Sequence, residues 1–368
     1  MKKQNLKIKN YTTDGKVVHF SKEKDINEKL IAVLGDKFLE YRKRWNKVNN
    51  LELITDFPLF LHVELNQKCN YECPHCIIGN IDDVEKFYPK ENGNIDFEAF
   101  KKIVDEGAEH NCPSISPQGD NEPLLIKNFE DYLYYAHKKN FIDIMFNTNG
   151  SPLTEERAQK ILDSGVTRLR ISLDAYTDEV YKKVRVGAID LEKVKRNIFK
   201  FLDLRDKGNY KLPIVGVSFC KIKTNEHEAK QFEDYWRDKV DFFSSQTYVP
   251  PTLTNVKYFD FYTEDQFLNQ SKKKFNCNQP YQRVVIRNNK IYPCCVTLVL
   301  PNDRSKDNLI IGDLTNSTIY EAWNGKKMTE LRDIHKNGDF RKNEICAGCV
   351  NSIYPTKKYL NEIARKLN

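Results

Sequence analysis

The stretch Cys69-Asn70-Tyr71-Glu72-Cys73-Pro74-His75-Cys76 lies shortly after an apolar run at residues 57–65. Its C-x3-C-x2-C spacing lets one short loop present three thiolates, which are soft ligands that favour iron–sulfur clusters or zinc. Three protein ligands leave one iron of a [4Fe-4S] cluster open to a small molecule. A structural zinc site completed by His75 is the alternative, but zinc ligands usually come as two separated pairs. The spacing therefore favours the cluster.

Apolar and β-branched runs alternate with helical patterns from residue 58 to about residue 250. The runs that predict strands are 59–65, 114–117, 142–147, 168–173, 214–219 and 240–247. The helical patterns between them cover 97–106, 129–139, 154–164, 191–205 and 226–237, the first with Asp96 as its expected N-cap. Strand–helix alternation of this kind predicts an α/β fold with a parallel sheet. Periodicity alone does not say whether that sheet closes.

The segments that flank this alternation differ from it. Residues 1–56 form a lead-in with two short predicted helices that break at Gly35. One helical stripe there carries Phe38, Tyr41 and Trp45, which we expect to pack against the main domain. After Pro250-Pro251 the alternation stops. We therefore expect three parts, the lead-in at 1–56, the α/β domain at 57–250 and a cysteine-rich domain at 251–368.

Composition narrows the class of protein. The chain has 368 residues, 40% of them hydrophobic, enough for one large and one smaller domain. No apolar run is long enough to span a membrane, and the first residues are too polar for a signal peptide. Ten cysteines without a secretion signal indicate a reducing compartment, so we expect a cytoplasmic location. The net charge of +7 is spread out, which favours a solvated surface or attraction of an anionic substrate. No basic stretch carries interleaved aromatic residues, which argues against a nucleic-acid partner.

On the cysteine loop and the strand–helix alternation, residues 57–245 resemble the radical S-adenosylmethionine (radical SAM) superfamily. The resemblance implies an open, partial (βα)6 TIM-like barrel with its site at the carboxyl ends of the strands. It implies that Cys69, Cys73 and Cys76 bind a [4Fe-4S] cluster whose open iron chelates SAM. An electron from a donor such as flavodoxin or ferredoxin then cleaves SAM to methionine and a 5′-deoxyadenosyl radical, which takes hydrogen from a substrate.

The resemblance also implies residues that bind SAM. Residues 119–123 resemble the family's GGEP motif, although Asp120 and Asn121 stand where the family has small residues. Glu122 matches the motif, and Asn149, at the end of the third strand, is expected to face the cofactor or the substrate.

Three further residues are assigned by the same resemblance. Ser172 is expected to hydrogen-bond a ribose hydroxyl, and His75 holds the position of a ring near adenine. Arg185 is expected to pair with the SAM carboxylate, a solvated helix arginine being the alternative.

A second group of cysteines lies in the C-terminal third, at Cys277, Cys294, Cys295, Cys346 and Cys349. Four such thiolates suit zinc or a [4Fe-4S] cluster equally well. The region resembles the twitch and SPASM extensions of radical SAM enzymes, small α+β domains that carry auxiliary clusters. Five cysteines are enough for one auxiliary [4Fe-4S] cluster, with Cys277, Cys346 and Cys349 among the ligands. Because Asn289 stands where the family has a glycine five residues before the ligand, Cys294 is expected to be the fourth.

Cys220, at the end of the fifth predicted strand, and Cys295 are candidate hydrogen donors, since a thiol can return a hydrogen atom to a substrate radical. A small buried hydrophobic residue is the alternative for Cys220. We expect oxidation or epimerisation of a small substrate, either a carbohydrate or a nucleotide-linked sugar. The alternatives are a peptide maturase, which epimerises residues or forms thioethers, and a zinc-binding structural protein without catalysis.

Overall fold

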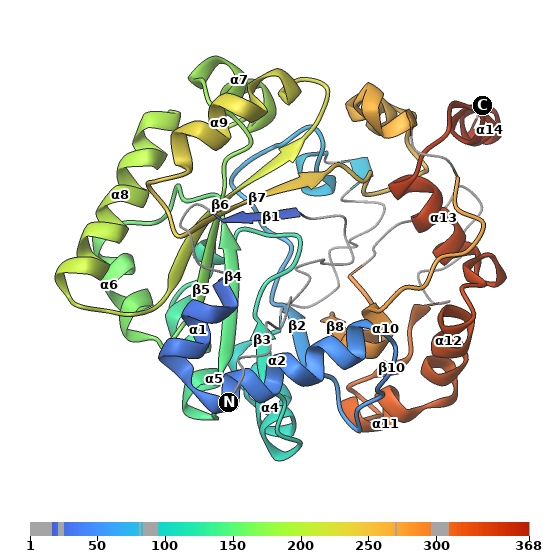
Figure 1. Ribbon diagram of the computed structural model, residues 1–368, viewed down its shortest axis with the longest axis horizontal. Helices are drawn as coiled ribbons and strands as arrows, with labels where there is room; N and C mark the ends of the chain where they lie inside the picture. Colours follow the sequence, from blue (N-terminus) through green and yellow to red (C-terminus); the bar gives the residue numbers. More distant parts are fainter. Residues whose placement is uncertain are drawn as a thin grey trace, which may run out of the picture.

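The computed structural model describes residues 17–20, 26–80, 82–83, 95–268, 271–295 and 309–367. Its centre is a curved sheet in which the described strands follow the order β1-β7-β6-β5-β4-β3-β2-β8-β9-β10. Figure 1 shows helices covering the outer side of this sheet. The strands are β1 (Val17–Phe20), β2 (Phe60–Glu64), β3 (Ser114–Ser116), β4 (Asp143–Thr148), β5 (Arg168–Ser172), β6 (Ile214–Lys221), β7 (Phe242–Thr247), β8 (Arg283–Arg287), β9 (Lys290–Tyr292) and β10 (Gly312–Asp313).

Strands β2 to β7 confirm the six predicted strands. Each pairs in parallel with its neighbour in chain order, as expected for successive strand–helix units. The strand order has two free ends, at β1 and β10, so the sheet is open. This confirms the predicted partial barrel. It also brings the carboxyl ends of β2 to β7 to one edge, where the loops that follow them meet.

The helices between the strands pack apolar faces onto the sheet. In α4 the Asp96 side chain accepts a hydrogen bond from Ala99 N at 2.8 Å, as a helix N-cap does, and Phe100, Ile103 and Val104 are buried. The helices of the barrel are α4 (Phe97–Glu109), α5 (Phe129–Lys138), α6 (Glu155–Asp163), α7 (Asp178–Val184), α8 (Leu191–Lys207) and α9 (Ala229–Trp236). Short 3-10 helices lie at Ile77–Gly79, Pro123–Leu125, Glu226–Glu228, Val256–Phe261, Glu264–Leu268 and Phe340–Lys342.

The lead-in folds as predicted around Gly35, whose φ of 72° separates α1 (Ile26–Leu34) from α2 (Asp36–Asn49). Phe38 and Tyr41 are buried, and the Tyr41 hydroxyl donates to Ser114 Oγ at 3.2 Å. The aromatic stripe thus packs against the main domain. Strand β1, which the sequence did not indicate, pairs antiparallel with β7.

The C-terminal region continues the sheet. Strand β8 pairs in parallel with β2, and β8 and β9 form a hairpin whose turn, Asn288-Asn289, has positive φ at both residues. Trp323 is buried and its Nε1 donates to Thr55 O at 2.6 Å, which fastens this region to the lead-in. The helices here are α10 (Gln279–Gln282), α11 (Ile319–Asn324), α12 (Lys326–Lys336), α13 (Glu344–Ile353) and α14 (Lys357–Leu367).

Within the part of the chain that the structure describes, no helix is both long and apolar enough to cross a membrane.

Candidate active site

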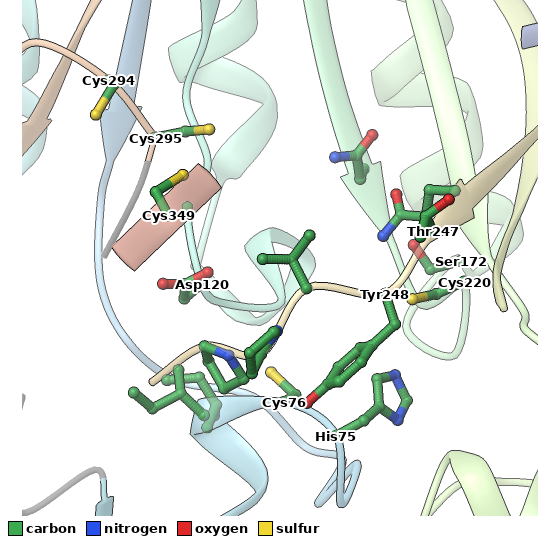
Figure 2. A pocket seen from close by; sticks show the side chains of 18 of the residues that line it. His75, Cys76, Asp120, Ser172, Cys220, Thr247, Tyr248, Cys294, Cys295 and Cys349 are labelled. Atoms are coloured by element: carbon green, nitrogen blue, oxygen red, sulfur yellow. The ribbon is translucent and has the colours of Figure 1, made fainter. Parts of the chain in front are cut away.

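One cavity of about 480 Å³ lies at the carboxyl ends of the barrel strands. Every residue that the sequence suggested for a cluster, for SAM or for hydrogen donation lines this cavity. Figure 2 shows Cys294, Cys295 and Cys349 on one side of it and Ser172 and Cys220 on another. The structure therefore brings the two groups of cysteines, far apart in the sequence, to one space. The role of each residue there stays a prediction.

The first cysteine loop follows β2 and folds back on itself. Cys76 N donates to Cys73 O at 3.0 Å, and Tyr71 N donates to Cys69 Sγ at 3.5 Å. At Gly79 a Cβ atom would lie 2.1 Å from the Cys73 carbonyl oxygen, so only glycine permits the fold. The loop is thereby wound tightly around its three thiols.

These thiols fit an iron–sulfur cluster. Burial raises the pKa of each thiol, that of Cys76 to about 12, so binding to metal as thiolates would release their protons. Among the described residues no three His, Cys, Asp or Glu side chains converge closely enough to hold a single ion. A cluster places each thiolate on a different iron, so its ligands stay apart.

Glu122 ties the loop after β3 to the end of β4. Its buried carboxylate accepts hydrogen bonds from Thr148 Oγ1 at 2.6 Å, Asn149 N at 2.6 Å and Leu124 N at 3.1 Å. Burial nevertheless raises the pKa of Glu122 to about 7. The Asn149 side chain in turn donates to Asn70 Oδ1 at 2.9 Å. Glu122 therefore fixes Asn149 after β4, and the Asn149 side chain holds Asn70 of the cysteine loop.

The raised pKa of Glu122 predicts a pH-dependent stability. Because the folded pKa exceeds the ordinary value, the protonated carboxyl stabilises the protein at low pH, and this is lost as the pH rises through 7. Between about pH 6 and pH 8 the wild type should lose about 1 kcal/mol more unfolding free energy than Glu122→Gln. Anaerobic denaturant titrations of the two holoproteins measure this. Parallel pH profiles would contradict it.

The residues that replace small residues in the predicted SAM motif have structural partners. Asp120 N donates to Glu64 Oε2 at 2.8 Å, and the Asp120 carboxylate accepts from Arg287 at 3.0 Å. Asn121 donates to Asn66 Oδ1 at 3.1 Å. Arg287 belongs to β8, so Asp120 joins the motif to the strand that leads to the second group of cysteines.

The remaining predicted residues lie on the same wall. The Ser172 hydroxyl accepts from Ser218 Oγ at 3.3 Å on the neighbouring strand. Arg185, expected at the SAM carboxylate, donates to Asp174 Oδ2 at 2.5 Å and to Cys73 Sγ at 3.6 Å. Arg185 is therefore held against the cysteine loop by a buried carboxylate to which the sequence assigned no role.

The second group of cysteines lines the opposite part of the cavity. Cys346 and Cys349 come from one turn of α13, and Asn343 caps that helix by accepting from Cys346 N at 2.9 Å. At the end of the hairpin, Gln279 accepts from Cys295 N at 2.9 Å and donates to Cys295 Sγ at 3.3 Å. Cys294 lies beside Cys295 (Figure 2). All five cysteines of this group line the cavity.

Sequence reasoning missed several residues of the cavity wall, among them Tyr248, Arg170 and Gln246. The Tyr248 hydroxyl is buried and has no hydrogen-bond partner among the described residues. Figure 2 shows the Tyr248 ring beside His75, with its hydroxyl toward Cys76. Alternation along β5 and β7 could have identified these residues in the sequence. Polar residues at every second position of a buried strand point into the barrel.

Known proteins resemble the chain in two regions. A family model described as the radical SAM superfamily matches residues 63–218, and one described as an iron–sulfur cluster-binding domain (SPASM) matches residues 277–350. A probable GTP 3′,8-cyclase of Methanococcus maripaludis is 30% identical over 176 residues, or 48% of this chain and 54% of the relative. The chain thus spans about half the length of that relative.

Solved structures share the fold. The structure of anSMEcpe with bound AdoMet aligns with a TM-score of 0.56 and 16% identity, covering 84% of this chain and 96% of that one. Streptococcus suis SuiB bound to its precursor peptide SuiA aligns with a TM-score of 0.56 and 15% identity, covering 89% and 77%.

The two family matches confirm the predicted cofactors, which are SAM, its [4Fe-4S] cluster and an auxiliary iron–sulfur centre. The barrel and the cavity at its strand ends agree with this assignment. Residues 63–218 therefore form a domain of the radical SAM superfamily, and residues 277–350 form a C-terminal SPASM iron–sulfur domain.

Proposed function

We propose that this radical SAM enzyme takes a hydrogen atom from a small carbohydrate-like substrate, such as a nucleotide-linked sugar, in the cavity between its two groups of cysteines. The observation that carries the proposal is the wall of that cavity. Ser218, Gln246 and Thr247 present neutral hydroxyl and amide groups on the neighbouring strands β6 and β7. Such groups match a ligand rich in hydroxyls. A relative named as a probable GTP 3′,8-cyclase supports a small, nucleotide-sized substrate.

The cofactors supply the difficult chemistry. When bound, the SAM-binding cluster and SAM supply a 5′-deoxyadenosyl radical, and the auxiliary cluster supplies a second redox centre. We propose Cys69, Cys73 and Cys76 as ligands of the first cluster, and Cys277, Cys346, Cys349 and one of Cys294 and Cys295 as ligands of one auxiliary cluster. We propose flavodoxin or ferredoxin as the electron donor.

The side chains near SAM then have binding and positioning roles. We propose that Ser172 and Asn149 bind SAM, with His75 beside its adenine. Glu122 keeps the cysteine loop in place through its contacts with β4. The buried ring of Tyr248 covers the loop and excludes water from the reacting centre.

Two outcomes are open to a substrate radical in this cavity. In an oxidation the substrate loses two hydrogens, one as an atom to the 5′-deoxyadenosyl radical and the other as a proton to solvent with an electron, for which the auxiliary cluster would be the acceptor. In an inversion the Cys220 or Cys295 S–H bond breaks, its hydrogen atom bonds to the substrate carbon from the opposite face, and an electron and a proton from the reductant and solvent restore the thiol. We propose Cys220 for this role because it lines the cavity near the end of β6.

Product mass distinguishes the two outcomes. Anaerobic reaction with SAM, dithionite and a panel of nucleotide sugars in deuterated water should give a product two hydrogens lighter, or an isomer carrying one deuterium. If the isomer forms, Cys220→Ala or Cys295→Ala should lower turnover by at least about 100-fold, whereas Cys112→Ala, a buried thiol outside the cavity, should not. Reaction with a peptide but with no sugar would overturn the proposed substrate class.

A further inference from the structure

The Asp174 carboxylate links three parts of the site. It lies just after β5, its side chain is 2% exposed, and it lines the cavity. Its Oδ2 accepts from Arg185 Nη2 at 2.5 Å and lies 3.7 Å from His75 Nε2, while its Oδ1 accepts from Cys220 N at 2.7 Å. One buried side chain thus contacts the cysteine loop, the Arg185 guanidinium and the strand that carries Cys220.

The backbone around Asp174 is unusual. Its φ of 60° lies in the left-handed region, which is unfavourable for a residue with a Cβ. The Asn225 side chain holds the turn by donating to Asp174 O at 2.8 Å and to Cys220 O at 2.9 Å. Burial alone would raise the pKa of Asp174, but Arg185 and His75 outweigh it and hold that pKa below its usual range. The carboxylate is therefore a fixed negative charge.

The Arg185 guanidinium connects the Asp174 charge to the first cysteine loop. Arg185 donates through Nη2 to Asp174 and through Nη1 to Cys73 Sγ, at 3.6 Å. The guanidinium is therefore shared between a carboxylate and a predicted cluster ligand. Removing the carboxylate leaves a net positive charge beside Cys73, and removing the guanidinium leaves a net negative charge there. In a buried site such changes act strongly, because little water screens them.

We propose that Asp174 is a positioning residue that sets the charge Arg185 presents to the cysteine loop and also fixes Cys220 on the cavity wall. The first half needs only the SAM-binding cluster. The second half rests on the proposed function, in which Cys220 donates a hydrogen atom.

The reduction potential of the SAM-binding cluster tests the first half. The holoprotein is titrated anaerobically without SAM or substrate and followed by EPR, and the cluster concerned is the one whose spectrum changes when SAM is added afterwards. Asp174→Asn should shift its potential upward, because positive charge favours the electron-rich reduced form. Arg185→Gln should shift it downward. The double variant Asp174→Asn/Arg185→Gln should return toward the wild-type value.

Asp241 provides a matched control. Asp174 contacts β6 near its carboxyl end, at Cys220, and Asp241 contacts the same strand near its start. Its side chain is also 2% exposed, it accepts from Val215 N at 2.8 Å, and it pairs with Arg205. Asp241→Asn should therefore destabilise the fold as Asp174→Asn does, while leaving the potential unchanged. Equal shifts in the two aspartate variants, or shifts of the same sign in Asp174→Asn and Arg185→Gln, would overturn the first half.

Deuterium incorporation tests the second half, with the substrate found in the nucleotide-sugar panel. Relative to Asp241→Ala, Asp174→Ala, which removes the acceptor of the Cys220 N–H, should lower the fraction of product carrying solvent deuterium by at least about tenfold, at equal 5′-deoxyadenosine formation. An unchanged fraction would overturn the positioning of Cys220. The potential measurement stands independently if no sugar reacts, so failure of the proposed function and failure of this inference give different results.

Discussion

Replacing Cys69, Cys73 or Cys76 with alanine is expected to remove about half of the iron and to lower SAM cleavage by more than about 100-fold. Loss of a residue that only supports a metal ligand costs up to about 100-fold, and loss of the ligand itself should cost more. Each thiol belongs to the tightly wound loop after β2, and the other two cannot close a cluster by themselves. Iron and sulfide analysis after anaerobic reconstitution, with chromatography of 5′-deoxyadenosine formed under dithionite, measures both effects.

Cys112→Ala is the matched control. Its thiol is also buried, with a pKa that burial raises to about 12, but it donates to Ser114 O at 3.5 Å beneath the sheet and does not line the cavity. It should retain full iron content and full cleavage. If a loop variant kept both, or if the wild-type loop held zinc after anaerobic preparation, the assignment of these three ligands would be wrong.

The sequence predicted what local patterns encode. The six barrel strands follow from short apolar runs between helical patterns, and all six exist as β2 to β7. The cysteine loop was found because its spacing needs no knowledge of the fold. Asp96 likewise caps its helix, because an N-cap acts on the backbone only three residues away.

What the sequence did not predict depends on contacts between distant segments. Strand β1 pairs with β7 and β8 pairs with β2, and no local pattern encodes such partners. Asp174 lies two residues after Ser172 in the sequence, but its link to Arg185 and Cys220 appears only once β5, α7 and β6 are packed. Tyr248 follows a strand directly, and only the fold shows that its ring lies beside that of His75 in the cysteine loop, with 6.4 Å between the ring centroids.

The auxiliary cluster gives the second large effect. Replacing both Cys346 and Cys349 with alanine should remove the other half of the iron, because both thiols come from one turn of α13 and line the cavity together. SAM cleavage should survive, since the first cysteine loop belongs to the barrel. If the reaction is an oxidation, product formation should fall by at least about 100-fold while 5′-deoxyadenosine still forms. Metal analysis and product chromatography measure the two effects separately.

Cys294 and Cys295 decide the remaining ligand, because they are neighbours and sequence spacing alone cannot separate them. The family pattern favours Cys294, and Gln279 holds Cys295 through both its N–H and its sulfur. Cys294→Ala should therefore lose the auxiliary iron, whereas Cys295→Ala should keep it. In the latter, an altered product with full iron content would identify Cys295 as a thiol that acts on the substrate. Loss of iron in Cys295→Ala alone would instead make Cys295 the ligand and leave Cys294 facing the cavity.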